Sequence, residues 1–141
     1  MPIRESEAHW NGGLKTGKGV VKTGSGGFEG RYSAGTRFGD DSGTNPEELI
    51  GAAHAGCFSM ALAMLLEQAG HAPERIDTLA KVHLDPEDGG YKISRIELDT
   101  RGTVPGIEQD AFEKQARAAK GDCPVSKALA GVEISVTARL E

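Results

Sequence analysis

The sequence contains few cysteines, few aromatic residues and no block of basic residues. Two cysteines in 141 residues exclude a secreted disulfide scaffold, where cysteine is several times more frequent. A net charge of −5 argues against a nucleic-acid partner or a membrane-surface partner. No run of 18 residues is wholly apolar, and the first residues lack the hydrophobic segment of a signal peptide. We therefore expect a soluble, cytoplasmic protein whose thiols are reduced at rest.

The composition is that of a globular protein. Charged residues make up 26% of the chain and apolar residues 38%, which excludes global disorder. A chain of 141 residues is long enough for one ordinary domain and too short for two. No repeat, linker or low-complexity tract divides it. We expect a single domain spanning residues 1–141.

Glycine is dense in the first third of the chain. No helical periodicity survives between Asn11 and Gly43, where short apolar stretches alternate with glycine-containing turns. This pattern predicts antiparallel strands over residues 8–10, 20–22 and 28–33.

A strong helix start follows. Asn45 stands at the N-cap position, Pro46 at the first helical position, and two acidic residues occupy the first turn. The helix is predicted to run to about Ala69, where Gly70 ends it in the left-handed conformation. Its middle is apolar or small on every side, which predicts burial on most faces.

The rest of the chain alternates between strand and helix patterns. Period-two alternation predicts two strands joined as a hairpin, then two helices, then a final strand. The predicted residues are 76–85 and 91–100 for the hairpin, 107–120 for a helix ended by Gly121, 123–130 for a small helix begun by Cys123, and 132–140 for the strand. The fold class is therefore α+β, with antiparallel sheets packed on one long buried helix.

The two cysteines have different local settings. Cys57 lies in the middle of the most apolar segment, so its simplest interpretation is a packed core thiol. Cys123 precedes Pro124 at a helix N-cap, where free N–H groups favour a thiolate, although cysteine is not a preferred cap. The two are 66 residues apart, and a transient disulfide between them suits a reducing compartment.

Other polar residues carry weak signals on their own. His54 and Cys57 are three residues apart on one helix, but zinc needs three or four ligands, so we expect no metal. His54 is interpreted as a core or interface histidine that donates to a carbonyl or carboxylate. Arg37 is placed in the loop before the helix, and Glu47 and Glu48 are explained as acids favoured by the helix dipole. These residues alone name no enzyme.

Three segments together resemble a known family. Residues 36–38, residues 43–62 and the Cys-Pro-Val-Ser sequence at 123–126 closely resemble the OsmC family, which includes the organic hydroperoxide resistance proteins. The likeness extends over essentially the whole chain. An arginine 20 residues before the first cysteine is typical of the OsmC branch.

The resemblance implies a thiol peroxidase that needs no cofactor. Cys57 would be the thiolate that attacks the peroxide, and Arg37 would stabilise this thiolate and the departing alkoxide. Glu47 would hold the arginine in place, which a bidentate guanidinium allows. Cys123 would condense with the Cys57 sulfenic acid to form a disulfide.

The resemblance also implies partners and assembly. The substrate would be an organic hydroperoxide, favoured by an apolar wall of Leu49, Ile50, Phe58 and Met60, and the reductant a dithiol of lipoyl or small-thiol type. The family forms intertwined homodimers, and the sequence leaves open which subunit donates Arg37. Two alternatives remain: a non-catalytic redox sensor or ligand-binding protein that uses the Cys57–Cys123 switch, and a structural dimer with inert core thiols.

Overall fold

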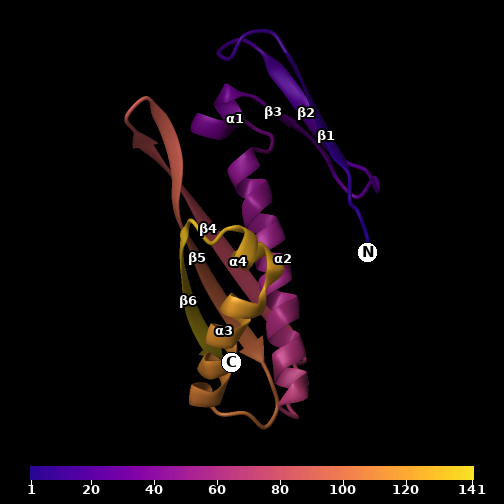
Figure 1. The fold of residues 1–141 in the computed structure, drawn as a ribbon, viewed down its shortest axis with the longest axis vertical. Coiled ribbons are helices and arrows are strands. Elements are labelled where there is room, and N and C mark those ends of the chain that lie inside the picture. The colour runs from indigo at the N-terminus through magenta and orange to yellow at the C-terminus, as the bar shows by residue number, and fades with distance from the viewer. The chain divides into compact units, whose positions relative to one another are not determined.

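The computed structural model describes all residues, 1–141, in two compact units (Figure 1). The first unit comprises Met1–Leu49 and the second Ile50–Glu141. Each unit contains one three-stranded sheet. The expectation of a single domain over residues 1–141 stays a prediction.

The sheet of the first unit is antiparallel, as predicted. Its strands follow one another in space as in sequence: β1 (Ser6–Asn11), β2 (Lys18–Thr23) and β3 (Glu29–Tyr32). Position 19 of β2 has room only for glycine, because a Cβ there would lie 2.2 Å from the His9 carbonyl oxygen of the neighbouring strand. Glycine is therefore required for the close pairing of β1 and β2.

A one-turn helix that the sequence analysis missed follows β3. Helix α1 (Ala34–Phe38) carries Arg37, so the prediction that Arg37 lies in a loop was wrong. Ser33 and Thr36 form a capping box: the Ser33 hydroxyl accepts from the Thr36 N–H at 3.2 Å, and the Thr36 hydroxyl accepts from the Ser33 N–H at 2.9 Å. Threonine replaces the usual Glu or Gln of this motif, which is why the pattern gave no helix signal.

The long helix α2 (Pro46–Gln68) begins and ends as predicted. The Asn45 side chain caps it by accepting a hydrogen bond from the Glu48 N–H at 2.7 Å, and Gly70 has a positive φ of 88° just beyond its end. In the single chain, however, α2 is buried along one stripe rather than on most faces. The opposite face is exposed and carries small and apolar residues, namely Ala52, Ala53, Gly56, Met60 and Met64.

The sheet of the second unit contains the predicted hairpin and one unexpected pairing. Strands β4 (Arg75–Glu87) and β5 (Gly90–Thr103) are antiparallel, with a bulge between His83 and Leu84. Strand β6 (Glu133–Leu140) pairs with β5 in parallel, whereas the sequence analysis expected antiparallel pairing throughout. Two helices separate β5 from β6 in the chain, so the chain crosses back to the same end of the sheet before β6 begins.

Those two helices meet at Cys123. Helix α3 (Gln109–Asp122) passes through Gly121, where the sequence analysis placed its end. The Cys123 N–H closes α3 by donating to the Ala119 carbonyl at 3.0 Å. Pro124 has no N–H to continue α3 and instead begins α4 (Pro124–Ala128). Cys123 is thus the C-cap residue of α3 and the N-cap residue of α4.

The core of the second unit lies between the buried stripe of α2, the hairpin and α3. Its largest fully buried apolar side chains are Phe58, Leu62, Leu66, Ile96, Leu98 and Phe112. By length and composition alone α2 could cross a membrane. The buried stripe of α2 nevertheless belongs to the core of this unit, and the predicted α+β class is confirmed.

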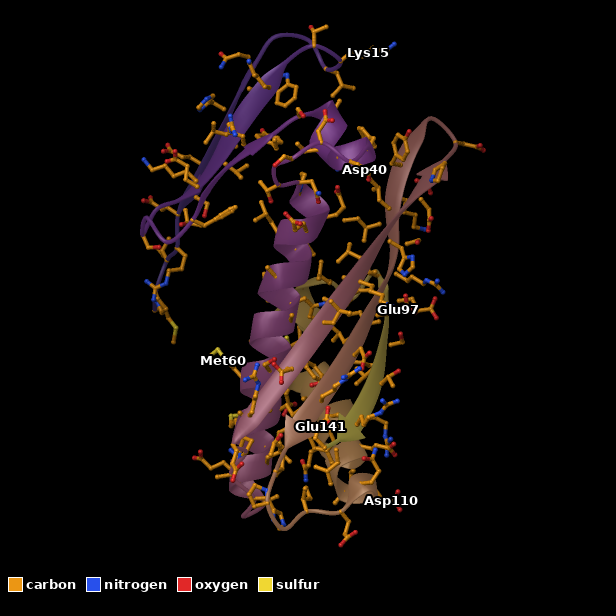
Figure 2. All side chains as sticks on the ribbon, turned by 180° about the vertical axis from the view of Figure 1, so that it is seen from behind. Lys15, Asp40, Met60, Glu97, Asp110 and Glu141 are labelled. Atoms are coloured by element: carbon orange, nitrogen blue, oxygen red, sulfur yellow. The ribbon has the colours of Figure 1, made fainter.

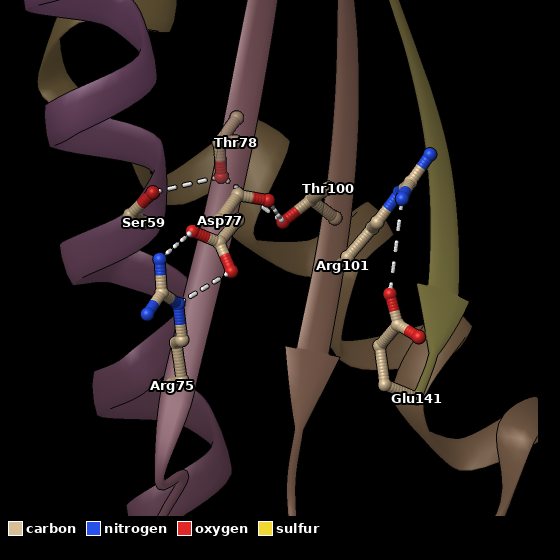
Figure 3. Close-up of polar contacts among 7 residues, drawn as sticks. All are labelled: Ser59, Arg75, Asp77, Thr78, Thr100, Arg101 and Glu141. Atoms are coloured by element: carbon tan, nitrogen blue, oxygen red, sulfur yellow. Dashed lines mark hydrogen bonds and ion pairs between the residues drawn. The ribbon is translucent and has the colours of Figure 1, made fainter.

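A chain of hydroxyl groups connects α2 to the hairpin (Figure 3). The Ser59 and Thr78 hydroxyl oxygens lie 2.7 Å apart, and those of Thr78 and Thr100 lie 3.0 Å apart. Thr100 is wholly buried, so its hydroxyl needs these partners. The contacts fix α2 against both strands two residues beyond Cys57.

Candidate active site

The structure brings the two cysteines together. Cys57 lies in the middle of α2 and Cys123 at the junction of α3 and α4, and their Sγ atoms are 2.8 Å apart in an S–H···S hydrogen bond. Both thiols are free, and 66 residues of chain separate them. Two sulfurs this close need only a small movement to reach the length of a disulfide bond.

The burial of the two thiols is the reverse of what their local sequences indicated. Cys123 is wholly buried, whereas Cys57 is only half-buried. The apolar neighbours of Cys57 in the sequence misled the simplest interpretation, because on a helix they belong to different faces. The half-buried thiol is the one that a molecule from solvent can reach.

The surroundings shift the pKa values of the two thiols in opposite directions. Burial raises the pKa of Cys57, and the nearby Cys123 sulfur adds to that rise. Burial also opposes ionisation of Cys123, but the hydrogen bond from Cys57 and the N–H groups and hydroxyl at the start of α4 outweigh it and lower its pKa. Within this unit the thiolate therefore forms first on Cys123, at a helix N-terminus, and the proton stays on Cys57.

A second contact joins the same two helices. His54 lies one turn before Cys57, and its Nε2 atom is 2.7 Å from the Ser126 hydroxyl of α4. His54 is fully buried and Ser126 nearly so. The sequence analysis expected a carbonyl or carboxylate partner for His54 and missed Ser126. The matching three-residue spacing of His54 to Cys57 and of Cys123 to Ser126 is the signal that could have found it.

Arg37 and Glu47 form a bidentate ion pair in the first unit. The guanidinium donates from Nε to Oε1 at 3.0 Å and from Nη2 to Oε2 at 2.8 Å. These hydrogen bonds to Glu47 raise the pKa of Arg37, against the opposing effect of burial. The glutamate side chain is 9% exposed and the arginine 39%, so a buried carboxylate holds a cation that is still open to solvent.

The neighbouring acid has a different task. Glu48 lies in the first turn of α2 and accepts a hydrogen bond from the Thr44 hydroxyl at 2.8 Å. This agrees with its interpretation as a helix-start residue. The structure contains no group of three or more His, Cys, Asp or Glu side chains that could hold a metal ion.

The fold is that of the organic hydroperoxide resistance proteins. The crystal structure of OhrB from Bacillus subtilis aligns with a TM-score of 0.73, covering 97% of this chain and 98% of that one at 24% identity. An organic hydroperoxide resistance protein from Elizabethkingia anophelis aligns with a TM-score of 0.72 at 28% identity, covering 99% of this chain and 97% of the other.

Sequence comparison identifies the family. Residues 39–137 match the family model described as OsmC-like protein, and the chain belongs to this family. It is 50% identical over 127 residues to peroxiredoxin OsmC of Escherichia coli strain K12, covering 89% of each. It is 35% identical over 99 residues to organic hydroperoxide resistance protein OhrA of Bacillus subtilis, covering 69% of this chain and 67% of that protein. The resemblance found in the sequence is confirmed.

Proposed function

We propose that this chain is a thiol-dependent peroxidase that reduces organic hydroperoxides to alcohols. The Cys57 thiolate attacks the outer oxygen of the peroxide, the O–O bond breaks, and an alkoxide leaves and takes a proton. Cys57 is then a sulfenic acid, and Cys123 displaces its hydroxyl group as water to form a disulfide. The observation that carries this proposal is the 2.8 Å separation of two free sulfurs, one of them half-buried.

Arg37 is the cation that activates Cys57 in this account. The groups around Cys57 in its own unit raise its pKa, so the thiolate needs a positive charge from outside that unit. Glu47 holds the guanidinium through Nε and Nη2, which leaves the Nη1 edge to face a thiolate and then the alkoxide. The buried Glu47 carboxylate thus orients the guanidinium while leaving part of it free to interact with another anion.

The exposed face of α2 favours assembly as a homodimer. Met60 is 76% exposed, and Figure 2 shows its side chain pointing away from the strands of its unit. A Cβ at Gly56 would meet nothing within 4 Å in the single chain. A mid-helix glycine costs about 1 kcal/mol relative to alanine, so the absence of any steric need within one chain favours a second helix that approaches this face. The partner is a second copy of this chain.

Half-buried and exposed apolar side chains along α2 suit an alkyl hydroperoxide. Leu49, Ile50 and Met60 remain available for such a wall. Phe58 does not, because it is fully buried in the core, and its expected place in the wall was wrong. The reductant is a dithiol of lipoyl or small-thiol type, which restores both thiols in the reducing cytoplasm where we place the protein.

Sustained turnover tests the proposal. Reduced protein is mixed with excess cumene hydroperoxide and dithiothreitol, and loss of peroxide is followed. We expect many equivalents of peroxide consumed per protein, and none above background for Cys57→Ser. Consumption of a single equivalent followed by arrest would overturn the peroxidase and favour a redox sensor built on the same switch. No reaction at all would make both thiols structural.

A further inference from the structure

Four side chains form a closed cluster between α2 and the start of α4. Helix α2 presents His54 and Cys57, three residues apart on one face, and α4 presents Cys123 and Ser126 with the same spacing. The two cross-contacts have nearly equal lengths, 2.8 Å between the sulfurs and 2.7 Å between His54 Nε2 and the Ser126 hydroxyl. The reaction described above uses only the sulfur pair.

The protonation of His54 follows from its surroundings. The ring is fully buried, and burial lowers its pKa, so it is neutral and carries one N–H. Its Nδ1 atom is buried without any hydrogen-bond partner. A proton on Nδ1 would strand a buried N–H donor, which costs more than an unpaired lone pair. The proton therefore belongs on Nε2, where it is donated to the Ser126 oxygen.

This tautomer sets the direction of the Ser126 hydroxyl. An oxygen that accepts from His54 keeps its own hydrogen free to donate elsewhere. Cys123 stands three residues before Ser126, at the N-cap of the same short helix. Burial opposes ionisation of Cys123, but the hydrogen bond from Cys57, followed by the N–H and the hydroxyl of Ser126, lowers its pKa. The His54–Ser126 contact therefore ties α2 to the turn that carries Cys123.

We propose that His54 and Ser126 are positioning residues for the resolving step: the buried hydrogen bond from His54 Nε2–H to the Ser126 hydroxyl fixes the start of α4 against α2, so that the Cys123 sulfur faces Cys57. The inference rests on the proposed function. The Cys123 sulfur attacks the Cys57 sulfur, an S–S bond forms and the S–O bond of the sulfenic acid breaks. The departing hydroxide combines with the proton that Cys123 has lost, giving water. His54 and Ser126 end the step with their own protons.

Single-turnover mass measurements separate this step from the first. Reduced protein is mixed with one equivalent of cumene hydroperoxide without reductant, quenched at intervals and weighed intact. The sulfenic acid is heavier than the reduced chain by about 16 Da, and the disulfide is lighter by about 2 Da. We expect Ser126→Ala and His54→Leu to form the sulfenic acid within about twofold of the normal rate but to lose it about 10- to 100-fold more slowly, because the start of α4 is no longer held against α2.

Conservative variants separate positioning from packing. Ser126→Thr keeps a hydroxyl and His54→Gln keeps an N–H donor, so each is expected to restore the second rate to within about threefold. Normal resolution in Ser126→Ala would overturn the inference, as would slow resolution in Ser126→Thr and Ser126→Ala alike. Absence of any sulfenic acid or disulfide in the unaltered protein would instead overturn the proposed function.

Discussion

At the scale of single residues, the account depends on where a proton lies. The Cys57 thiol can attack a peroxide only as a thiolate, yet burial and the neighbouring sulfur raise its pKa. In the proposed site Arg37 reverses this preference, and Glu47 keeps the guanidinium aligned through two hydrogen bonds. The pH dependence of the first step therefore reports directly on the arginine.

Removal of the Arg37 charge is expected to move that pH dependence. The rate of sulfenic acid formation rises with pH as Cys57 ionises. Loss of an adjacent positive charge raises the pKa of Cys57, so in Arg37→Met the rising limb should shift upward by about 1 to 3 pH units. The rate near neutral pH should fall accordingly. The measurement is the stopped-flow rate with cumene hydroperoxide between mildly acidic and alkaline pH.

Arg37→Lys is the matched control for this change. Lysine keeps the charge but lacks the planar guanidinium that binds Glu47 in a bidentate way. The pH at which the rate rises should therefore lie between the values for the unaltered protein and for Arg37→Met. If the pH dependence of the rate is unchanged in Arg37→Met, a group other than Arg37 promotes the ionisation of Cys57. Circular dichroism of each variant checks that the fold is retained.

Among single residues, the sequence predicted which side chains pair better than it predicted their burial. The resemblance named both cysteines and the arginine with its glutamate, and the structure places each of these two pairs in contact. The relative burial of the thiols was reversed, because apolar neighbours in sequence lie on different sides of a helix. Ser126 was missed because its partner His54 is 72 residues away, and only the matching three-residue spacing from each of them to a cysteine links the two.

At the scale of elements, the Asn45 side chain joins α1 to the first turn of α2, both within the first unit. Asn45 does this with both ends of its amide: Oδ1 accepts from the Glu48 N–H at 2.7 Å, and Nδ2 donates to the Thr36 carbonyl of α1 at 3.1 Å. One side chain thus caps α2 and holds α1, which carries Arg37, beside it.

Asn45→Ala is expected to lower the free energy of unfolding by about 1 kcal/mol, the usual cost of a lost N-cap. Asn45→Asp keeps the cap oxygen but loses the donor to Thr36, so it should recover most of the stability while leaving α1 less firmly held. Urea unfolding followed by circular dichroism gives both values. Equal stability of Asn45→Ala and the unaltered protein would contradict this role for the cap.

The elements that sequence predicted are those with local signals. Asn45, Pro46 and Gly70 mark the ends of α2 because caps and left-handed glycines depend on adjacent residues. The parallel pairing of β6 with β5 could not be read, since alternation of apolar and polar residues is the same in parallel and antiparallel edge strands. Helix α1 was missed because its capping box uses an uncommon residue pair.

At the scale of the whole molecule, the exposed apolar face of α2 is the surface that the proposed homodimer would bury. Met60→Glu places a carboxylate on that face, and burial of an unpaired charge in an interface is strongly unfavourable. We expect the dimer dissociation constant to rise by about 100-fold or more, which sedimentation equilibrium would measure. Leu79→Glu, at an exposed outward position of β4, is the control and should leave association unchanged. A Met60→Glu protein that dimerises normally would contradict an interface on this face.

The central claim is that Cys57 and Cys123 form one redox couple, and intact mass tests it most directly. Reduced protein is treated with one equivalent of cumene hydroperoxide and then weighed and assayed for free thiols. The account predicts loss of both thiols and a decrease of about 2 Da, with Cys123→Ser stopping at a gain of about 16 Da and Cys57→Ser unchanged. Survival of both thiols, or oxidation of Cys123 in the Cys57→Ser variant at the normal rate, would contradict it.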